Sequence, residues 1–160
     1  MFQRIAYTQS REENYKTLHQ QLDALLEGEK NRIANLANAS ALLYQFLEDV
    51  NWAGFYLLEG DELILGPFQG LPACTRIPLG KGVCGTAAVR METVRVEDVH
   101  QFPGHIACDA ASRSEIVVPM IHEGQLVGVL DIDSPKLNRF DAVDQTYLER
   151  FVEVLMQHWQ

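Results

Sequence analysis

The sequence predicts an α+β fold in which an antiparallel sheet packs against helices. Two segments near the N-terminus, residues 11–28 and 31–48, carry apolar residues at helical spacing. The middle of the chain, residues 51–135, changes to short apolar runs divided by glycine-containing turns, which are typical of strands. Helical spacing returns after Asp141, a favourable N-cap residue. Helices, a run of strands and a last helix together give the α+β order.

The elements between the helices follow one another closely, with glycine at most of the turns. In chain order we expect a hairpin over 51–69 turning at Gly60-Asp61, a short strand over 75–78, a glycine loop entering a short helix over 80–90, a strand over 93–96, an irregular stretch over 97–113 and a hairpin over 114–135. A loop as long as residues 97–113 in a compact domain is more often functional than idle.

The last hairpin is apolar on both faces, which predicts a central pair of strands covered on both sides. Two turns fit its centre. A two-residue turn at Glu123-Gly124 would direct Glu115 away from Asp131, because a shift of one residue exchanges the faces of a strand. A three-residue turn with Gly124 in the left-handed position would set Glu115 opposite Asp131. We predict the three-residue turn, which brings Glu115, Asp131 and Asp133 onto one face.

Length and composition limit the classes of protein. The chain has 160 residues, of which 47% are hydrophobic, so we expect one domain over residues 1–160 with a core of its own. The N-terminus lacks the apolar stretch of a secretory signal, and no apolar run is long enough to span a bilayer. We therefore expect a cytoplasmic protein without a membrane partner. A formal net charge of −9 repels phosphate backbones, so nucleic acid is not an expected partner.

Three cysteines, Cys74, Cys84 and Cys108, are the first candidates for chemistry. An odd number in a reducing compartment argues against a structural disulfide framework. Each could be a buried small residue, a metal ligand or a reactive thiol. All three lie in glycine-rich or irregular segments, which favours reactive thiols. Cys84 lies where a loop enters a helix, and amide groups and the helix dipole there would stabilise a thiolate.

Acidic residues form the second candidate group. Asp131 and Asp133 alternate with apolar residues, so both face the same side of a strand that is otherwise apolar. Strand interiors disfavour aspartate, and a buried carboxylate is costly without a partner. Asp133 could simply cap the loop at Ser134-Pro135, an explanation that fits Asp131 less well. Glu115 opens the paired strand. On pattern alone, Trp52 in the first strand reads as a core aromatic.

Five segments form long, ordered motifs: NWAGFYLL, LGPFQGLPAC, GKGVCGTAA, DVHQFPGHIACDAASRSEIVVP and GVLDIDSP. Together they closely resemble the free methionine-(R)-sulfoxide reductases, enzymes built on a GAF-like fold. The resemblance extends from about residue 30 to the C-terminus. It implies a central antiparallel sheet of about six strands, with N- and C-terminal helices packed on one face and a loop-covered ligand pocket on the other.

The resemblance also implies the reaction, a thiol-dependent reduction of free methionine-(R)-sulfoxide to methionine. A thiolate attacks the sulfoxide sulfur, methionine leaves, and the cysteine becomes a sulfenic acid. A second cysteine then forms an intramolecular disulfide, which thioredoxin reduces. By position, Cys108 matches the attacking cysteine of the family, and Cys74 and Cys84 match its resolving or recycling thiols. The sequence leaves open which of these two pairs with Cys108, and whether the protein is a homodimer.

The resemblance assigns the remaining site residues. Trp52 matches an aromatic that contacts the methyl end of the substrate, and Glu115, Asp131 and Asp133 match acids that hold its amino group or polarise its S–O bond. These residue types suit the chemistry, because the sulfoxide oxygen leaves as water and a carboxyl group with a raised pKa can supply the proton. We expect Glu115 and Asp133 to act in the chemical step, and all three acids to line one pocket with Cys108 and Trp52.

Two other classes of function fit parts of the sequence. A GAF-like domain can be a non-catalytic module that senses a small ligand or a redox state, since fold alone does not fix function. His105 and Cys108 stand three residues apart and could ligate the metal of a hydrolase, but a closed zinc site needs four convergent ligands. We therefore expect no metal and no cofactor, and we keep the sensor module as the alternative.

Overall fold

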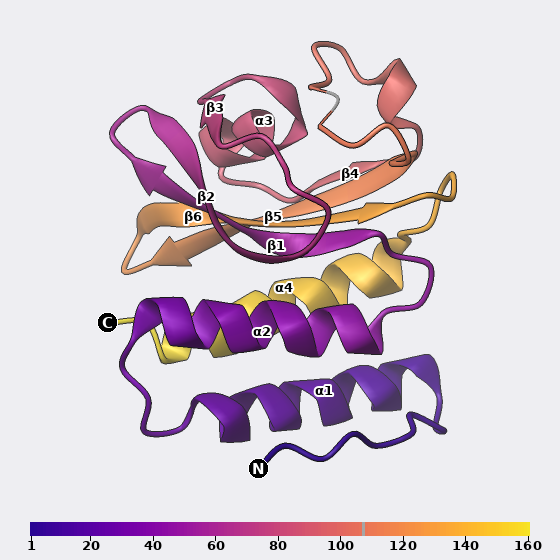
Figure 1. The fold of residues 1–160 in the computed structure, drawn as a ribbon, viewed down its shortest axis with the longest axis vertical. Helices are drawn as coiled ribbons and strands as arrows, with labels where there is room; N and C mark the ends of the chain where they lie inside the picture. Colours follow the sequence, from indigo (N-terminus) through magenta and orange to yellow (C-terminus); the bar gives the residue numbers. More distant parts are fainter. Residues whose placement is uncertain (107) are drawn as a thin grey trace.

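A six-stranded antiparallel sheet separates a layer of helices from a cap of loops and one short helix (Figure 1). The computed structural model describes residues 1–106 and 108–160. In chain order the elements are α1 (Arg11–Leu26), α2 (Arg32–Phe46), β1 (Trp52–Glu59), β2 (Glu62–Gly70), β3 (Arg76–Pro78), α3 (Gly82–Arg90), β4 (Val94–Val96), a 3-10 helix (Val99–Gln101), β5 (Ser114–His122), β6 (Gln125–Ser134) and α4 (Ala142–Gln157). The strand order across the sheet is β3-β2-β1-β6-β5-β4, and the predicted α+β class is confirmed.

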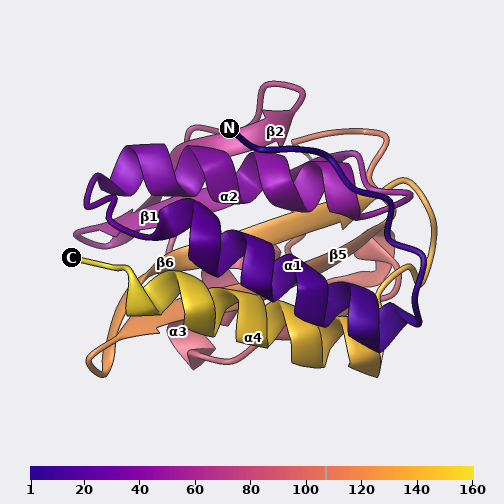
Figure 2. The same ribbon diagram turned by 90° about the horizontal axis from the view of Figure 1, so that it is seen from below.

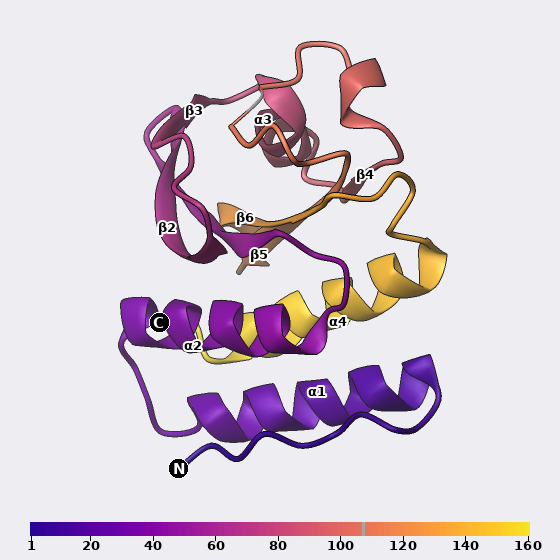
Figure 3. The same ribbon diagram turned by 45° about the vertical axis from the view of Figure 1, so that its right-hand side comes forward.

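Three helices cover one face of the sheet. Helices α2 and α4 pack on the strands, and α1 lies beneath both of them as an outer helix (Figures 2 and 3). At the start of α4 the side chains of Asp141 and Asp144 form a capping box, which confirms the helix start predicted at Asp141. Buried leucines such as Leu22 and Leu43 join the inner face of the sheet in the larger core. No helix of the described residues is long and apolar enough to cross a bilayer.

Helix α3 and the connecting loops cover the opposite face of the sheet (Figure 3). The predicted glycine loop enters α3 at Gly82, whose φ of 62° lies in the left-handed region. A Cβ atom on Gly85 would lie 2.7 Å from the carbonyl oxygen of Pro78, so glycine allows α3 to approach β3 closely. A second, smaller core of buried side chains lies between α3 and the sheet. This layer therefore holds the neighbouring Cys84 against the sheet.

The β5–β6 hairpin has a shorter turn than we predicted. Glu123 and Gly124 have φ values of 52° and 78°, the left-handed pair of a two-residue turn, and His122 pairs with Gln125 across it. The prediction of a three-residue turn was wrong because Glu123 also adopts the left-handed conformation, which we had assigned to the glycine alone.

A register shift beside this turn keeps Glu115 on the same face of the sheet as Asp131 and Asp133, as predicted. The register shifts between Met120 and Ile121, and beyond that point Glu115 pairs with Asp133, not with Asp131 as predicted. The shift by one residue reverses the change of face that the shorter turn would cause. Glu115, Asp131 and Asp133 therefore lie on the same face of the sheet, the one that α3 and the loops cover.

Candidate active site

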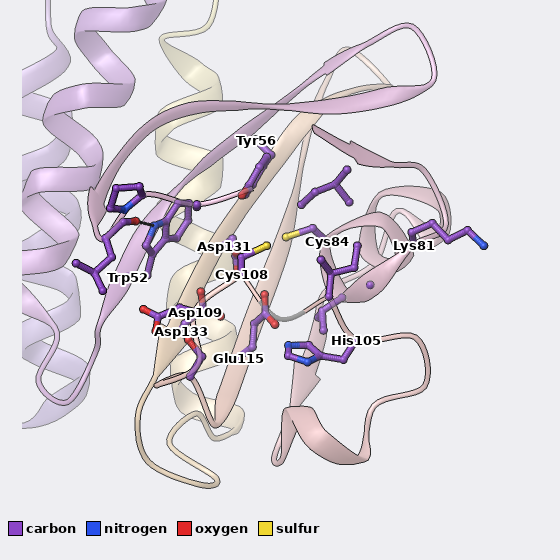
Figure 4. Close-up of a pocket in the computed structure, with 18 residues that line it drawn as sticks. Trp52, Tyr56, Lys81, Cys84, His105, Cys108, Asp109, Glu115, Asp131 and Asp133 are labelled. Atoms are coloured by element: carbon purple, nitrogen blue, oxygen red, sulfur yellow. Dashed lines mark hydrogen bonds between the residues drawn. The ribbon is translucent and has the colours of Figure 1, made fainter. Parts of the chain in front are cut away.

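One cavity lies between the sheet and the layer of α3 and loops (Figure 4). Its empty volume is about 550 Å³ with the open mouth included. Strands β1, β5 and β6, helix α3 and the segments around 71–73 and 105–112 contribute its walls. The lining includes six of the predicted site residues, namely Trp52, Cys84, Cys108, Glu115, Asp131 and Asp133. The prediction that the three acids share a pocket with Cys108 and Trp52 is confirmed.

A disulfide joins Cys108 to Cys74, the one predicted site residue outside the lining. Their α-carbons are 5.6 Å apart, which is ordinary disulfide geometry. Aromatic residues of β1 hold the loop that carries Cys74: the Tyr56 hydroxyl donates to the Cys74 carbonyl at 2.8 Å, and the Trp52 indole N–H donates to the Leu71 carbonyl at 3.1 Å. Of the two pairings that the sequence left open, the structure contains the Cys74–Cys108 bond.

Cys84 is a free thiol, buried on α3. Burial raises the pKa of the Cys84 thiol well above its ordinary value, and the charges of the neighbouring acids raise it further. Its sulfur lies within 4.8 Å of carboxylate oxygens of Glu115 and Asp131. The expectation that the helix N-terminus makes Cys84 a stabilised thiolate was therefore wrong, because desolvation and nearby carboxylates act against the helix dipole at this position.

The three acids form one cluster that shares protons, in which Glu115 and Asp131 are buried and Asp133 is half-buried. Burial raises the pKa of Glu115, Asp131 and Asp133, and the charge of Asp131 further raises the pKa of the other two acids. Hydrogen bonds from Glu115 and Cys84 act in the opposite direction on the pKa of Asp131. Negative charge in the cluster is thus best placed on Asp131, and protons are best placed on Glu115 and Asp133.

The Asp131 side chain also offers an open acceptor. Its Oδ1 atom is buried, and among residues 1–106 and 108–160 it has no hydrogen-bond partner. A buried polar atom without a partner is uncommon, and a ligand that donates to it is one explanation. Asp131 can therefore receive a cationic group at the wall of the cavity, next to two carboxyl groups that can donate protons.

The same corner contains a set of possible metal ligands. Single ligand atoms of Cys84, Glu115 and Asp131 lie within 4.8 Å of one another. Zinc is bound by such thiolate and carboxylate groups, but it would have to displace the protons that these buried groups retain. Burial raises the pKa of all three side chains, so we interpret the set as a proton-sharing cluster. The Cys108 sulfur, in its bond to Cys74, is not free to join His105 as a thiolate ligand.

Aromatic side chains form the apolar wall of the cavity. Trp52 is only 3% exposed and stacks on Phe68, with ring centroids 5.1 Å apart. Trp52 also stacks on Tyr56, at 5.9 Å between centroids. Trp52 is therefore both a core aromatic, as its pattern indicated, and a rigid surface of the site.

Comparisons with known proteins agree with this geometry. The GAF domain family matches residues 23–159. Protein YtsP of Bacillus subtilis is 60% identical over 147 residues, 91% of this chain and 90% of that protein. Free methionine-R-sulfoxide reductase of Escherichia coli is 57% identical over 143 residues, 89% of this chain and 87% of that enzyme.

A solved structure gives the same result. The free methionine-R-sulfoxide reductase from Neisseria meningitidis, in complex with its substrate, is 42% identical and superposes with a TM-score of 0.93, covering 99% of this chain and 96% of that one. The chain belongs to the free methionine-R-sulfoxide reductase family.

This member of the reductase family has cavity residues that the sequence analysis missed. Tyr56 lies four residues after Trp52 on β1, and the two-residue period of a strand could have placed both on one face. Asp109 and Ser112 line the cavity from the irregular segment, which has no periodicity to reveal them. His105 lies there too, and burial, followed by the charge of His100, lowers its pKa, so His105 is neutral at neutral pH.

Proposed function

We propose that this protein reduces free methionine-(R)-sulfoxide to methionine, with its cysteine thiols as reductant. The observation that supports this most is the placement of a redox-active pair, Cys108 bonded to Cys74, beside three carboxyl groups in one cavity, two of them buried and the third, Asp133, half-buried. The relatives from Escherichia coli and Neisseria meningitidis carry the name of this activity. We also propose that residues 1–160 act as a single catalytic domain.

The cavity suits a free amino acid that carries a sulfoxide. The substrate ammonium binds the acid cluster, where Asp131 has an open, charged acceptor. The part of the Trp52 ring that lines the cavity receives the methyl end, which needs an apolar surface. The segments around 71–73 and 105–112 line the cavity, and we infer that they leave no path for the residues that flank a sulfoxide within a peptide chain.

The first step transfers oxygen from the substrate to Cys108. The Cys108 thiolate attacks the sulfoxide sulfur while Glu115 or Asp133 donates a proton to the oxygen. An S–S bond forms between Cys108 and the substrate, and the protonated oxygen then moves to the Cys108 sulfur as its bond to the substrate sulfur breaks. The S–S bond breaks with its electron pair passing to the substrate sulfur, which leaves Cys108 as a sulfenic acid. The substrate sulfur gains two electrons and leaves as methionine, and Cys108 loses the same two electrons. A carboxyl group whose pKa burial has raised keeps the required proton at neutral pH.

The second step forms the disulfide. The Cys74 sulfur attacks the Cys108 sulfur, an S–S bond forms, the S–O bond of the sulfenic acid breaks, and the oxygen leaves as water. Thioredoxin then returns two electrons and two protons through a mixed disulfide, which restores both thiols. Cys84, whose pKa burial raises, keeps its proton throughout.

A turnover assay with thioredoxin as reductant tests the proposal. It compares the two epimers of methionine sulfoxide, each as the free amino acid and within a peptide. We expect rapid turnover of the free R epimer and neglect of the other three substrates. Equal rates on free and peptide-bound sulfoxide would contradict the closed cavity. Binding of the free R epimer without any methionine formed would instead support the alternative, a non-catalytic sensor module.

A further inference from the structure

We propose that Asn51 is a positioning residue for Cys108, because its side-chain amide fixes the segment that directly follows this cysteine. The inference rests on the proposed function, in which Cys108 is the attacking thiol. Asn51 immediately precedes β1 and does not line the cavity, and its role is to hold the group that does.

Asn51 connects two walls of the site. Its backbone N–H donates to the carbonyl oxygen of Asp133 at 3.0 Å, which ties it to the end of β6. Its side-chain Nδ2 donates to Asp109 Oδ2 at 3.0 Å and to Ser112 Oγ at 3.2 Å. One residue thus joins the strand that carries the acids to the segment that carries Cys108.

The segment after Cys108 is itself a tight turn. Asp109 Oδ1 accepts from the backbone N–H of Ala111 at 2.8 Å, and the Asp109 carbonyl oxygen accepts from the backbone N–H of Ser112 at 3.2 Å. The two Asn51 bonds therefore hold a preformed unit, and Cys108 is the residue next to it. This anchor limits how far the Cys108 sulfur can move from the acid cluster.

Position matters here because Cys108 has two successive partners. Its sulfur must first reach the sulfoxide beside Glu115 and Asp133, and then reach Cys74 in the loop before β3. A misplacement of about 1 Å at a reacting atom can cost on the order of 100-fold in rate. An anchor one residue away from the sulfur is therefore expected to affect the chemical step more than substrate binding.

The anchor also sets the surroundings of Asp133. Asp133 faces Asp131 on its own strand, Glu115 on β5 and Asp109 in the loop (Figure 4). Burial, then the charge of Asp131, and also the charge of Asp109 raise the pKa of Asp133. By holding Asp109 in place, Asn51 helps to keep a proton on an acid that the proposed reaction uses.

The direction of the Asn51 bonds allows a specific test. Asp109 offers only acceptors, so the Asn51 amide turns its donor toward it, and within the described residues the buried Asn51 Oδ1 has no partner. Asn51→Asp would set two carboxylates against each other. Asn51→Asp combined with Asp109→Asn would rebuild the bond with donor and acceptor exchanged and with the net charge of the pair unchanged.

The experiment measures methionine formed in a single turnover by the fully reduced protein, and substrate affinity in a Cys108→Ser background. Asn51→Ala should slow the single turnover by about 10- to 100-fold, with affinity changed less than about twofold. Asn51→Asp should be slower still, and the exchanged double variant should be at least about tenfold faster than Asn51→Asp, short of full recovery because it also removes the Asp109 charge that faces Asp133. Asn38→Asp, at an exposed position on α2, is the matched charge control and should leave the rate unchanged.

Three results would overturn the inference. They are an Asn51→Ala rate equal to that of the unmodified protein, an exchanged double variant no faster than Asn51→Asp, and a loss confined to affinity. Asn51→Ala keeps the test decisive if Asn51→Asp does not fold. If the unmodified protein forms no methionine at all, the proposed function fails, which is distinct from a failure of the Asn51 assignment.

Discussion

Replacing Glu115 by glutamine should slow the chemical step and leave the cavity in place. Glu115 is only 6% exposed, pairs with Asp133 across the sheet, and has a carboxylate oxygen within 4.8 Å of one of Asp131. Glutamine has nearly the same shape and can still donate a hydrogen bond to one of these acids, but it has no proton to transfer. The substitution therefore separates proton donation from packing.

The size of the effect follows from the number of donors. A positioned general acid contributes about 10²- to 10⁴-fold to a rate. Both Glu115 and Asp133 have a raised pKa, caused first by burial, so Asp133 can supply part of the lost function. We expect Glu115→Gln to lie at the low end, about 100-fold, or about 2.7 kcal/mol in activation free energy. Glu115→Gln combined with Asp133→Asn should approach the upper end of the range.

Single-turnover methionine formation across pH is the assay. In the unmodified protein the rate should fall as pH rises through the raised pKa of the cluster, because the donor is active only while protonated. This alkaline limb should weaken in Glu115→Gln. Glu59→Gln, at an exposed position at the end of β1, is the matched control and should retain the full rate. A Glu115→Gln rate within threefold of the unmodified protein would refute the assignment of a proton donor to Glu115.

Three further predictions follow from the same geometry. Cys108→Ser should abolish methionine formation in a single turnover, whereas Cys74→Ser should form one equivalent and then stop; a full burst from Cys108→Ser would exclude it as the nucleophile. Tyr56→Phe, which removes the 2.8 Å hydrogen bond to the Cys74 carbonyl, should slow disulfide formation about fivefold, as expected for one bond of about 1 kcal/mol, and an unchanged rate of thiol loss would argue against this support. The folded protein binds more protons than the unfolded chain between the ordinary and the raised carboxyl pKa, so its free energy of unfolding should fall as pH rises through that window. In thermal melts the stability of Glu115→Gln relative to the unmodified protein should therefore increase as the pH rises from acid to neutral. The same pH dependence of stability in both proteins would contradict a buried, protonated Glu115.

The sequence was sufficient to predict the sheet, its hairpins and the helices, because periodicity and turn residues are local signals. The turn at Gly60-Asp61 and the start of α4 at Asp141 are both where they were expected. The β5–β6 turn was not, since a non-glycine residue, Glu123, adopts a positive φ. Glu115 still shares a face with Asp131 and Asp133 only because the register shift near Met120 offsets the shorter turn. The pattern of apolar and polar residues around Met120 does not predict such a shift.

The candidate site was predictable in its membership and less so in its electrostatics. Alternation placed Asp131 and Asp133 on one face, and the family resemblance supplied Cys108 and Trp52. Burial, and then carboxyl groups more than thirty residues away in the chain, raise the pKa of the Cys84 thiol. Its position at the start of a helix predicted a lowered pKa, which is the wrong direction. Such long-range burial and charge are properties of the folded molecule.

The contacts of Asn51 were also not predictable from the sequence. Its two side-chain bonds reach Asp109 and Ser112, in a segment where no periodic pattern predicts which side chains turn inward. The choice of Cys74 as the partner of Cys108 likewise depends on how two loops meet above the sheet, because neither cysteine lies in a regular element.

The central claim is that this cavity reduces a free sulfoxide through Cys108 and Cys74. The most direct test treats fully reduced protein with one equivalent of free methionine-(R)-sulfoxide, without external reductant, and measures both methionine and the disulfide by mass spectrometry of peptides. The account predicts one methionine per chain and a single new bridge, Cys74–Cys108, with Cys84 still a free thiol. Methionine formed together with a bridge to Cys84, or no methionine from protein that binds the sulfoxide, would contradict it.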